Sequence, residues 1–391
     1  MFKNNRSLAI IALISIVNAL GYGIIIPILY SYSHRFGLTD FQNGILFALF
    51  SLCQFLSTPV IGRLSDKYGR KPLLIISVSG TAVSFLMMAF APSAIFLFLA
   101  RALDGITAGN IPVATAVITD TTKPQDRAKG FGIIGAAFGL GFIVGPMISA
   151  LTVGINPALP FLIAAAITIL AVVLTILFLP ETNKAMGKAK KEQLFNFKKL
   201  IHALEHGVIG TTLLVTLFYN FAFAMFIFAF QSSTAQVLHM SPNQISLIFS
   251  LFGLIGVIAQ VFLIKKVLEV FKIKKTMYYS LIAVAMSFLW MYVTRSQFSF
   301  VIACVMLALT NSFVQPLTQT FLSEETSETE QGEIMGINTS YMSIGQIIGP
   351  VVAGALATIS ISTPFLGAAL CTVVCIYLTK KIFRHKEVKF V

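Results

Sequence analysis

The chain has 391 residues, of which 57% are hydrophobic, 11% are charged and 35 are Phe. A water-soluble domain cannot cover that much apolar surface with so few charges, so the composition predicts an integral membrane protein. The formal net charge is +13. The cations stand in short loops between apolar runs and not along one face with interleaved aromatic residues, so no nucleic-acid partner is expected.

Twelve apolar runs reach the length of about 20 residues that a helix needs to cross the hydrocarbon core of a bilayer. The predicted helices cover residues 8–31, 42–62, 73–92, 94–118, 130–152, 158–180, 208–231, 243–263, 276–294, 297–321, 333–357 and 362–383. The first run is too long for the hydrophobic region of a signal peptide, so we interpret it as a span. The predicted fold class is an all-α membrane protein with twelve transmembrane helices in two six-helix bundles.

A polar segment between the sixth and seventh spans divides the chain. We expect an N-terminal bundle, a cytoplasmic linker and a C-terminal bundle at residues 1–180, 181–207 and 208–391. Placing the N-terminus inside puts nearly all Lys and Arg on the cytoplasmic side, as the positive-inside rule requires. The sequence thus predicts a multi-pass protein of the cell membrane with both termini in the cytoplasm.

The two halves of the chain repeat each other at an offset of about 200 residues. Asn18 in the first predicted helix corresponds to Asn220 in the seventh, and Gly145–Pro146 in the fifth corresponds to Gly349–Pro350 in the eleventh. Such a repeat predicts two bundles related by an axis along the membrane normal, with a pathway between them.

Several short motifs occupy the first half. Residues Gly62, Leu64, Asp66, Gly69, Arg70 and Lys71 fit the pattern G-x-L-x-D-x-x-G-R-K between the second and third spans. The other matches are Arg101 and Gly105 in the fourth helix, Asp120 and Arg127 at the junction that follows, and Gly135, Gly139, Gly141, Gly145 and Pro146 in the fifth. Together they resemble the motifs of the major facilitator superfamily, and among its members the twelve-helix tetracycline and multidrug exporters of the drug/proton antiporter group.

The resemblance covers the whole chain. It implies alternating access powered by inward proton flow and a small-molecule substrate. It also implies conformational roles for Gly62, Asp66, Gly69, Arg70, Lys71, Asp120, Arg127, Gly135, Gly139, Gly145, Pro146, Gly349 and Pro350. The charged stretch Gly62–Lys71 would latch the second helix against the eleventh, and the alternative is a loop that only holds orientation. The glycines of the fifth helix predict a groove in which another helix packs closely.

Asp104 is predicted to lie deep in the fourth span, roughly 15 Å along its axis. An ionised carboxylate there costs about 2.5–3.5 kcal/mol on insertion scales, so it should be paired, protonated or open to water. Arg101 stands three residues earlier on the same face. We predict that Asp104 and Arg101 couple protons to transport; a structural ion pair is the alternative.

Polar residues on otherwise apolar spans are the predicted lining of the substrate pathway, because an unpaired amide in hydrocarbon is costly. They are Asn18, Tyr22, Gln54, Asn110, Asn220, Gln260, Asn311, Gln315 and Gln319, with Phe223 and Phe226 as an aromatic wall. No acid lies within the seventh, eighth or tenth predicted helix. Since buried cations need a carboxylate partner, this favours neutral, zwitterionic or chelated substrates.

The sequence shows no phosphate loop of the Walker type and no catalytic constellation, so neither ATP, a metal nor another cofactor is expected. It predicts a transporter and not an enzyme: a monomeric, proton-coupled exporter of small amphipathic compounds, working with protons and a lipid bilayer. The alternatives are a narrow-specificity sugar or metabolite exporter and, less favoured, a transporter-like ligand sensor.

Overall fold

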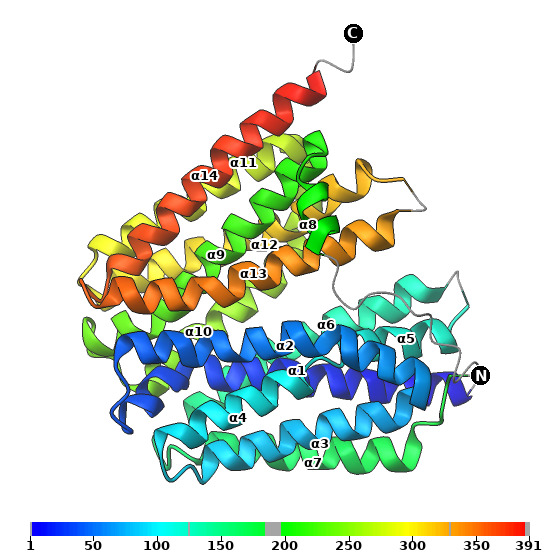
Figure 1. Ribbon diagram of the computed structural model, residues 1–391. Coiled ribbons are helices and arrows are strands. Elements are labelled where there is room, and N and C mark those ends of the chain that lie inside the picture. The colour runs from blue at the N-terminus through cyan, green and yellow to red at the C-terminus, as the bar shows by residue number, and fades with distance from the viewer. Residues whose placement is uncertain (1, 124–125, 184–196, 328–329, 388–391) are drawn as a thin grey trace. The chain divides into compact units, whose positions relative to one another are not determined.

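The computed structural model describes residues 2–123, 126–183, 197–327 and 330–387. Among these residues every extended regular element is a helix (Figure 1). The first half holds α1 (Phe2–His34), α2 (Asp40–Tyr68), α3 (Arg70–Ala89), α4 (Ala94–Thr107), α5 (Ile111–Thr121), α6 (Arg127–Thr152) and α7 (Leu159–Phe178). The second holds α8 (Phe197–Ala203), α9 (Gly207–Gln236), α10 (Pro242–Ile258), the π-helical η2 (Ala259–Leu263), α11 (Ile264–Val293), α12 (Gln297–Glu324), α13 (Gln331–Ala357) and α14 (Thr363–Glu387).

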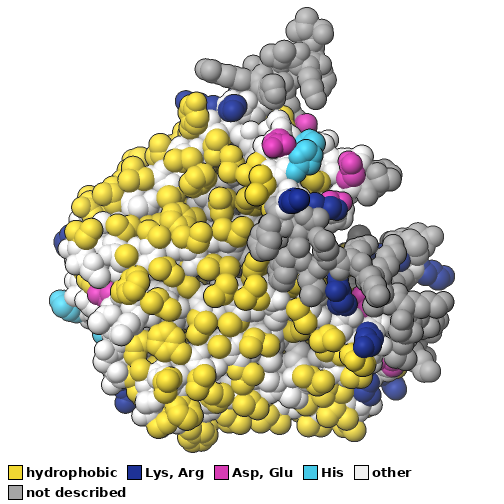
Figure 2. Space-filling view, in the orientation of Figure 1, with side chains coloured by type: hydrophobic (Ala, Val, Ile, Leu, Met, Phe, Trp, Pro, Cys, Tyr) yellow, Lys and Arg dark blue, Asp and Glu magenta, His cyan; other side chains and the backbone are white. Residues whose placement is uncertain are grey.

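Twelve helical stretches of the described chain are long and apolar enough to cross a membrane, as predicted. Figure 2 shows hydrophobic side chains over much of the face in view, while most of the visible Lys and Arg side chains gather on its right side. Exposed Ile76, Leu151 and Phe262, each more than 60% accessible, belong to this apolar surface. Lipid would cover such a surface in a chain with twelve spans.

One predicted span and one predicted loop differ from the structure in their local form. The fourth span, Ala94–Thr121, consists of α4 and α5, which are separated by a turn at residues 108–110. The stretch 264–275, predicted as a loop between the eighth and ninth spans, is helical and belongs to α11. Most of the predicted linker, residues 184–196, lies outside the described residues.

Contacts divide the chain into two compact units. Unit 1 consists of Met1–Leu38, Leu49–Phe195 and Ser241–Ser250, and unit 2 of Thr39–Ala48, Asn196–Met240 and Leu251–Val391. The first residues of α2 therefore belong to unit 2, where a Cβ on Gly44 would overlap the Pro350 carbonyl oxygen. The first residues of α10 belong to unit 1, where Asn243 Nδ2 donates to the Ala150 carbonyl oxygen at 2.6 Å.

Unit 1 is built around α1, which packs against α6 and α7, while α3 packs against α4 and α7 (Figure 1). Buried Ile11, Ile14 and Leu74 form its apolar core with residues of α5 and α7. The α1–α6 contact is very close, since a Cβ on Gly145 would lie 3.0 Å from the Gly23 backbone. The predicted glycine groove of α6 thus includes Gly145.

The groove does not include every glycine of the motif. A Cβ on Gly135 would meet no described atom within 4 Å. The expected close packing is therefore wrong at this position, because the part of α6 that carries Gly135 faces open space.

Unit 2 repeats this arrangement with α9 packed against α13 and α14. A Cβ on Gly345 of α13 would lie 2.7 Å from the Leu217 oxygen, and one on Gly349 would lie 2.7 Å from the Ala224 Cβ. Glycines of α13 thus bring it onto α9 as Gly145 brings α6 onto α1. The sequence repeat corresponds to a repeated helix contact.

We expect Gly145→Ile to destabilise the protein by about 1–3 kcal/mol, because the added side chain must push α6 away from α1. The melting temperature of the purified protein in detergent measures this. Gly135→Ile is the matched control on the same helix, and it should leave the melting temperature unchanged. Equal melting temperatures for the two variants would contradict the packing described for α1 and α6.

Candidate functional site

An ion pair lies buried inside the fourth span of unit 1. Arg101 Nη1 is 3.1 Å from Asp104 Oδ2, and both side chains are 7% exposed. The guanidinium carbon of Arg101 also stands 4.3 Å from the ring centroid of Phe50 on α2. Arg101 Nε has no hydrogen-bond partner among the described residues. The pair thus neutralises two charges that would be very costly alone in hydrocarbon, and it keeps one donor unused.

The glycine of the R-x-x-x-G motif explains how Arg101 reaches Phe50. A Cβ on Gly105 would overlap the Phe50 carbonyl oxygen, and one on Gly109 would lie 2.6 Å from Ser57 Oγ. Only residues without a side chain allow α4 and the turn after it to approach α2 so closely. The motif therefore positions its own arginine over an aromatic ring.

Amide and phenol side chains form a second polar group in unit 1. Asn18 Nδ2 donates to Asn110 Oδ1 at 2.7 Å, and Tyr22 Oη donates to Gln54 Oε1 at 2.8 Å. Gln54 Nε2 donates in turn to the Ala108 carbonyl oxygen at 3.2 Å. The turn at residues 108–110 thus supplies both the Ala108 carbonyl that accepts from Gln54 and the side chain of Asn110. The structure brings together these four predicted pathway residues from α1, α2 and the α4–α5 junction.

Unit 2 has a corresponding polar group without charges. Tyr219 Oη donates to Asn311 Oδ1 through a short hydrogen bond, and Thr216 Oγ1 donates to Asn338 Oδ1 at 2.8 Å. Asn220 Nδ2 donates to the Thr216 carbonyl oxygen at 2.9 Å. The pairs Asn18–Asn110 and Tyr219–Asn311 both span 92 residues, so the two units carry similar polar contacts, shifted by one residue from the correspondence of Asn18 with Asn220.

Sequence reasoning missed Thr216, Tyr219 and Asn338. The available signal was the repeat itself, since Tyr219 adjoins Asn220, the counterpart of Asn18.

Other predicted pathway residues do not join these groups. Gln260, Gln315 and Gln319 are exposed, with Gln260 in η2 and the other two on α12. Phe223 is half-buried, whereas Phe226 is fully buried and packs against Phe252 and Phe288 at ring-centroid distances of 5.7 Å. Phe226 belongs to the aromatic core of unit 2, and its place in the wall of the pathway stays a prediction.

The charged stretch Gly62–Lys71, predicted to lie in a loop between the second and third spans, is mostly helical. α2 continues to Tyr68, and the turn is made by Gly69 with φ 105°. This left-handed conformation is strained for residues with a side chain, so glycine is required there. Gly62 lies inside α2, where a Cβ would make an ordinary contact with Pro112 at 3.8 Å.

Arg70 joins two acids beside this turn. It lies 2.6 Å from Asp66 Oδ1 through Nη1 and 3.3 Å from Asp120 Oδ2 through Nε. Asp120 stands near the end of α5, whereas Arg127 is exposed at the start of α6. Lys71 Nζ donates to the Ile176 carbonyl oxygen of α7 at 2.7 Å. These contacts tie α2 and α3 to α5 and α7 within unit 1; the latch to the eleventh helix stays a prediction.

Glu181, which sequence reasoning missed, caps the turn. Its carboxylate accepts the backbone N–H groups of Arg70 at 2.9 Å and Lys71 at 3.1 Å, the first residues of α3. It also accepts the backbone N–H groups of its neighbours Thr182 and Asn183, at 2.9 and 2.8 Å. A carboxylate at a helix N-terminus satisfies unpaired donors and interacts favourably with the helix dipole.

Among the described residues, no group of three or more His, Cys, Asp and Glu side chains is arranged to hold a metal ion. Twelve candidate spans with buried polar groups at equivalent places in two units define a multi-pass membrane protein of the transporter class.

The chain belongs to the Major Facilitator Superfamily, whose family model matches residues 11–231 and 212–389. It is similar to the quinolone resistance protein NorA of Staphylococcus aureus, with 28% identity over 368 residues and 93% of each chain covered. It is also similar to the class H tetracycline resistance protein of Pasteurella multocida, with 28% identity over 371 residues that cover 92% of this chain and 90% of that protein.

Two solved structures share the fold. The human organic anion transporter MFSD10 (TETRAN) matches with a TM-score of 0.71 and 21% identity, covering 96% of this chain and 99% of that one. The nucleoside transporter NupG matches with a TM-score of 0.79 and 15% identity, covering 96% and 99%. The predicted family and fold are confirmed, and so is the prediction of a transporter and not an enzyme. Membership implies a small-molecule substrate and a membrane location.

We expect Glu181→Gln to loosen the Gly69 turn, because the neutral amide is a weaker acceptor for the Arg70 and Lys71 amides. Losing about 1.4 kcal/mol of charge-assisted hydrogen bonding would speed amide exchange of these two residues roughly tenfold. Hydrogen–deuterium exchange measures this. Glu205→Gln, an exposed acid in the other unit, is the control. Unchanged exchange at Arg70 and Lys71 would contradict the capping role.

Proposed function

We propose that this protein is a proton-coupled secondary transporter that exports small amphipathic compounds from the cell by alternating access. The observation that carries the proposal is the buried Arg101–Asp104 pair. In the described chain, no other ion pair between side chains lies inside a candidate span and away from the ends of that span. The relatives named for quinolone and tetracycline resistance, each similar over nearly the whole chain, support export as the direction of transport.

Proton coupling follows from the energetics of this pair. With Asp104 ionised, Arg101 is neutralised at 3.1 Å. A proton on Asp104 leaves the guanidinium buried without a counter-charge, and breaking a buried pair in this way costs about 3–5 kcal/mol. A cost of that size is enough to shift a two-state equilibrium from mostly one conformation to mostly the other. Proton binding from outside and release inside would then drive the conformational cycle.

The substrate is proposed to contact the amide and phenol groups of both units. Asn18, Tyr22, Asn110 and Asn311 already hydrogen-bond within the protein, so a substrate would exchange partners with them at little cost. The polar group of unit 2 contains no acid. This supports zwitterionic, neutral or chelated substrates over permanent cations.

The remaining features enter as further parts of the same proposal. The protein would act as a monomer in the cell membrane, with both termini and the linker in the cytoplasm, and its bundles at residues 1–180 and 208–391 would rock against each other. The ion-paired cluster of Asp66, Arg70 and Asp120 would stiffen the cytoplasmic end of unit 1 during this motion.

We expect Asp104→Asn to abolish coupled export, because the amide cannot carry a proton through the cycle. Efflux of a tetracycline from loaded cells, with and without an uncoupler, measures this, and efflux by the variant should fall at least about tenfold, a barrier change of about 1.4 kcal/mol. Asp126→Asn, an exposed acid before α6, is the matched control. Export that ignores the uncoupler would reject proton coupling, and full activity of Asp104→Asn would reject its role as the proton carrier.

We expect Asn311→Asp to extend transport to permanent cations, since it adds a carboxylate beside Tyr219 in the uncharged group of unit 2. A transport panel of quinolone, tetracycline and quaternary ammonium compounds measures this. The wild type should prefer the first two, and Asn311→Ala should gain no cation transport. A wild-type panel in which only permanent cations move would overturn the proposed substrate class.

A further inference from the structure

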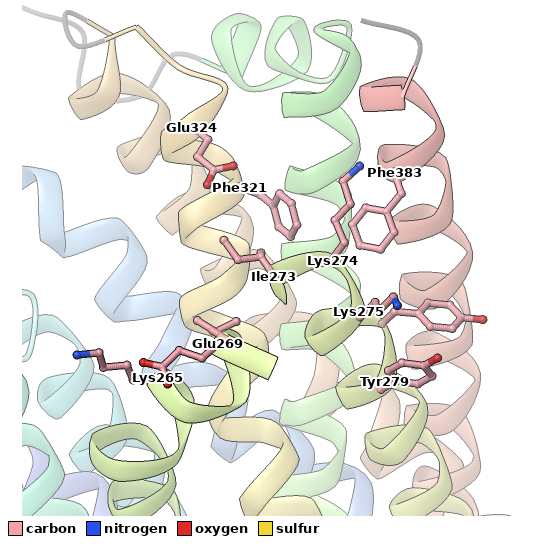
Figure 3. Close-up of a pocket in the computed structure, with 11 residues that line it drawn as sticks. Lys265, Glu269, Ile273, Lys274, Lys275, Tyr279, Phe321, Glu324 and Phe383 are labelled. Atoms are coloured by element: carbon pink, nitrogen blue, oxygen red, sulfur yellow. The ribbon is translucent and has the colours of Figure 1, made fainter. Parts of the chain in front are cut away.

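A cavity of about 890 Å³ opens in unit 2 where α11, α12 and α14 come together (Figure 3). Its volume lies in the range of small-molecule sites, which is about 300–1,000 Å³. Its walls are largely apolar and include Leu268, Ile273, Phe321 and Phe383. None of these residues belongs to the polar groups described above, so the cavity is separate from the proposed transport site.

The cavity lies at the ends of the candidate spans. Ile273 begins the span Ile273–Val293, Glu324 ends the span Gln297–Glu324, and Phe383 ends the span Thr363–Phe383. The ends of spans mark the boundary between hydrocarbon and water. The cavity is therefore at the depth of lipid headgroups, with its apolar walls continuing toward the acyl chains.

Lysine side chains line two sides of the cavity. Lys265, Lys274 and Lys275 line it, and none forms an ion pair with a described residue. Lys274 Nζ stands 5.6 Å from the Phe383 ring centroid, and Lys380 Nζ stands 5.3 Å from that of Tyr278. Figure 3 shows Lys265 on one side of the cavity and Lys274 and Lys275 on the other. Cations held over aromatic rings at this depth are placed to meet a phosphate.

We propose that this cavity binds an anionic phospholipid, with its phosphate among Lys274 and Lys275 and an acyl chain along Leu268 and Phe321. Glu269 and Glu324 also line the cavity and offset part of the lysine charge. A free phosphate ion would gain only the electrostatic attraction that is left after Glu269 and Glu324 offset part of the lysine charge. A lipid also buries apolar surface against the walls of the cavity. The residual positive charge favours a lipid with net negative charge over a zwitterionic one.

Native mass spectrometry of the delipidated full-length protein, titrated with phosphatidylglycerol or phosphatidylcholine, tests this. The wild type should retain phosphatidylglycerol in preference to phosphatidylcholine. Lys274→Gln/Lys275→Gln should weaken phosphatidylglycerol binding about 30-fold, the change expected from the loss of two lysines near a lipid surface. Lys266→Gln/Lys381→Gln removes two exposed lysines near the same helix ends that do not line the cavity, and it should bind like the wild type.

Leu268→Trp tests the apolar part of the site without changing charge, and it should weaken phosphatidylglycerol binding by filling the acyl-chain wall. Inorganic phosphate, added up to a thousandfold molar excess over lipid, should not displace the lipid. Displacement by phosphate would overturn the lipid assignment in favour of a soluble anion site. Equal lipid binding by the wild type and Lys274→Gln/Lys275→Gln, with both proteins monodisperse, would overturn the proposal entirely.

Discussion

Burying charge inside an apolar span is the constraint on which this structure depends. Arg101 and Asp104 are acceptable there only as a pair, and the pair needs Phe50 to lie over the guanidinium. Phe50 is within reach because Gly105 lets α4 contact the α2 backbone. Gly105 thus helps to hold the buried Arg101–Asp104 pair against α2. The same pair gives the protein a group whose charge state and conformation are linked, which is what coupled transport requires.

The internal repeat supplies the frame for this site and also an asymmetry. Glycines bring α6 tightly onto α1 in unit 1 and α13 tightly onto α9 in unit 2, and Asn18 of α1 and Tyr219 of α9 each bond to an Asn 92 residues later. Unit 1 adds the Arg101–Asp104 pair, whereas the polar group described in unit 2 consists of hydroxyl and amide side chains. In the proposed mechanism, one unit therefore senses protons while both contact the substrate.

The spans were predictable because an apolar run of the right length satisfies its backbone hydrogen bonds in a bilayer by forming a transmembrane helix. Their local form was not. The turn at residues 108–110 lies where Gly105 and Gly109 bring the chain close to α2. α2 continues to Tyr68 because charged residues can extend a helix beyond the hydrocarbon. The polar residues of the site were predictable by type, since buried amides need partners. Their partners were not predictable, because Tyr219 bonds to Asn311 and Glu181 bonds to the Gly69 turn over long distances in the sequence. Pattern alone also could not separate core Phe226 from half-buried Phe223.

The most direct test of the central claim is proton movement driven by substrate alone. Protein reconstituted in liposomes with an internal pH dye is given a tetracycline gradient and no other energy source. Coupled exchange predicts that protons move opposite to the tetracycline, so that an inward tetracycline gradient raises the internal pH. This rise should be absent from protein-free liposomes and from liposomes with the Asp104→Asn variant. Tetracycline movement by the wild type with no change of internal pH would contradict proton coupling through the buried pair.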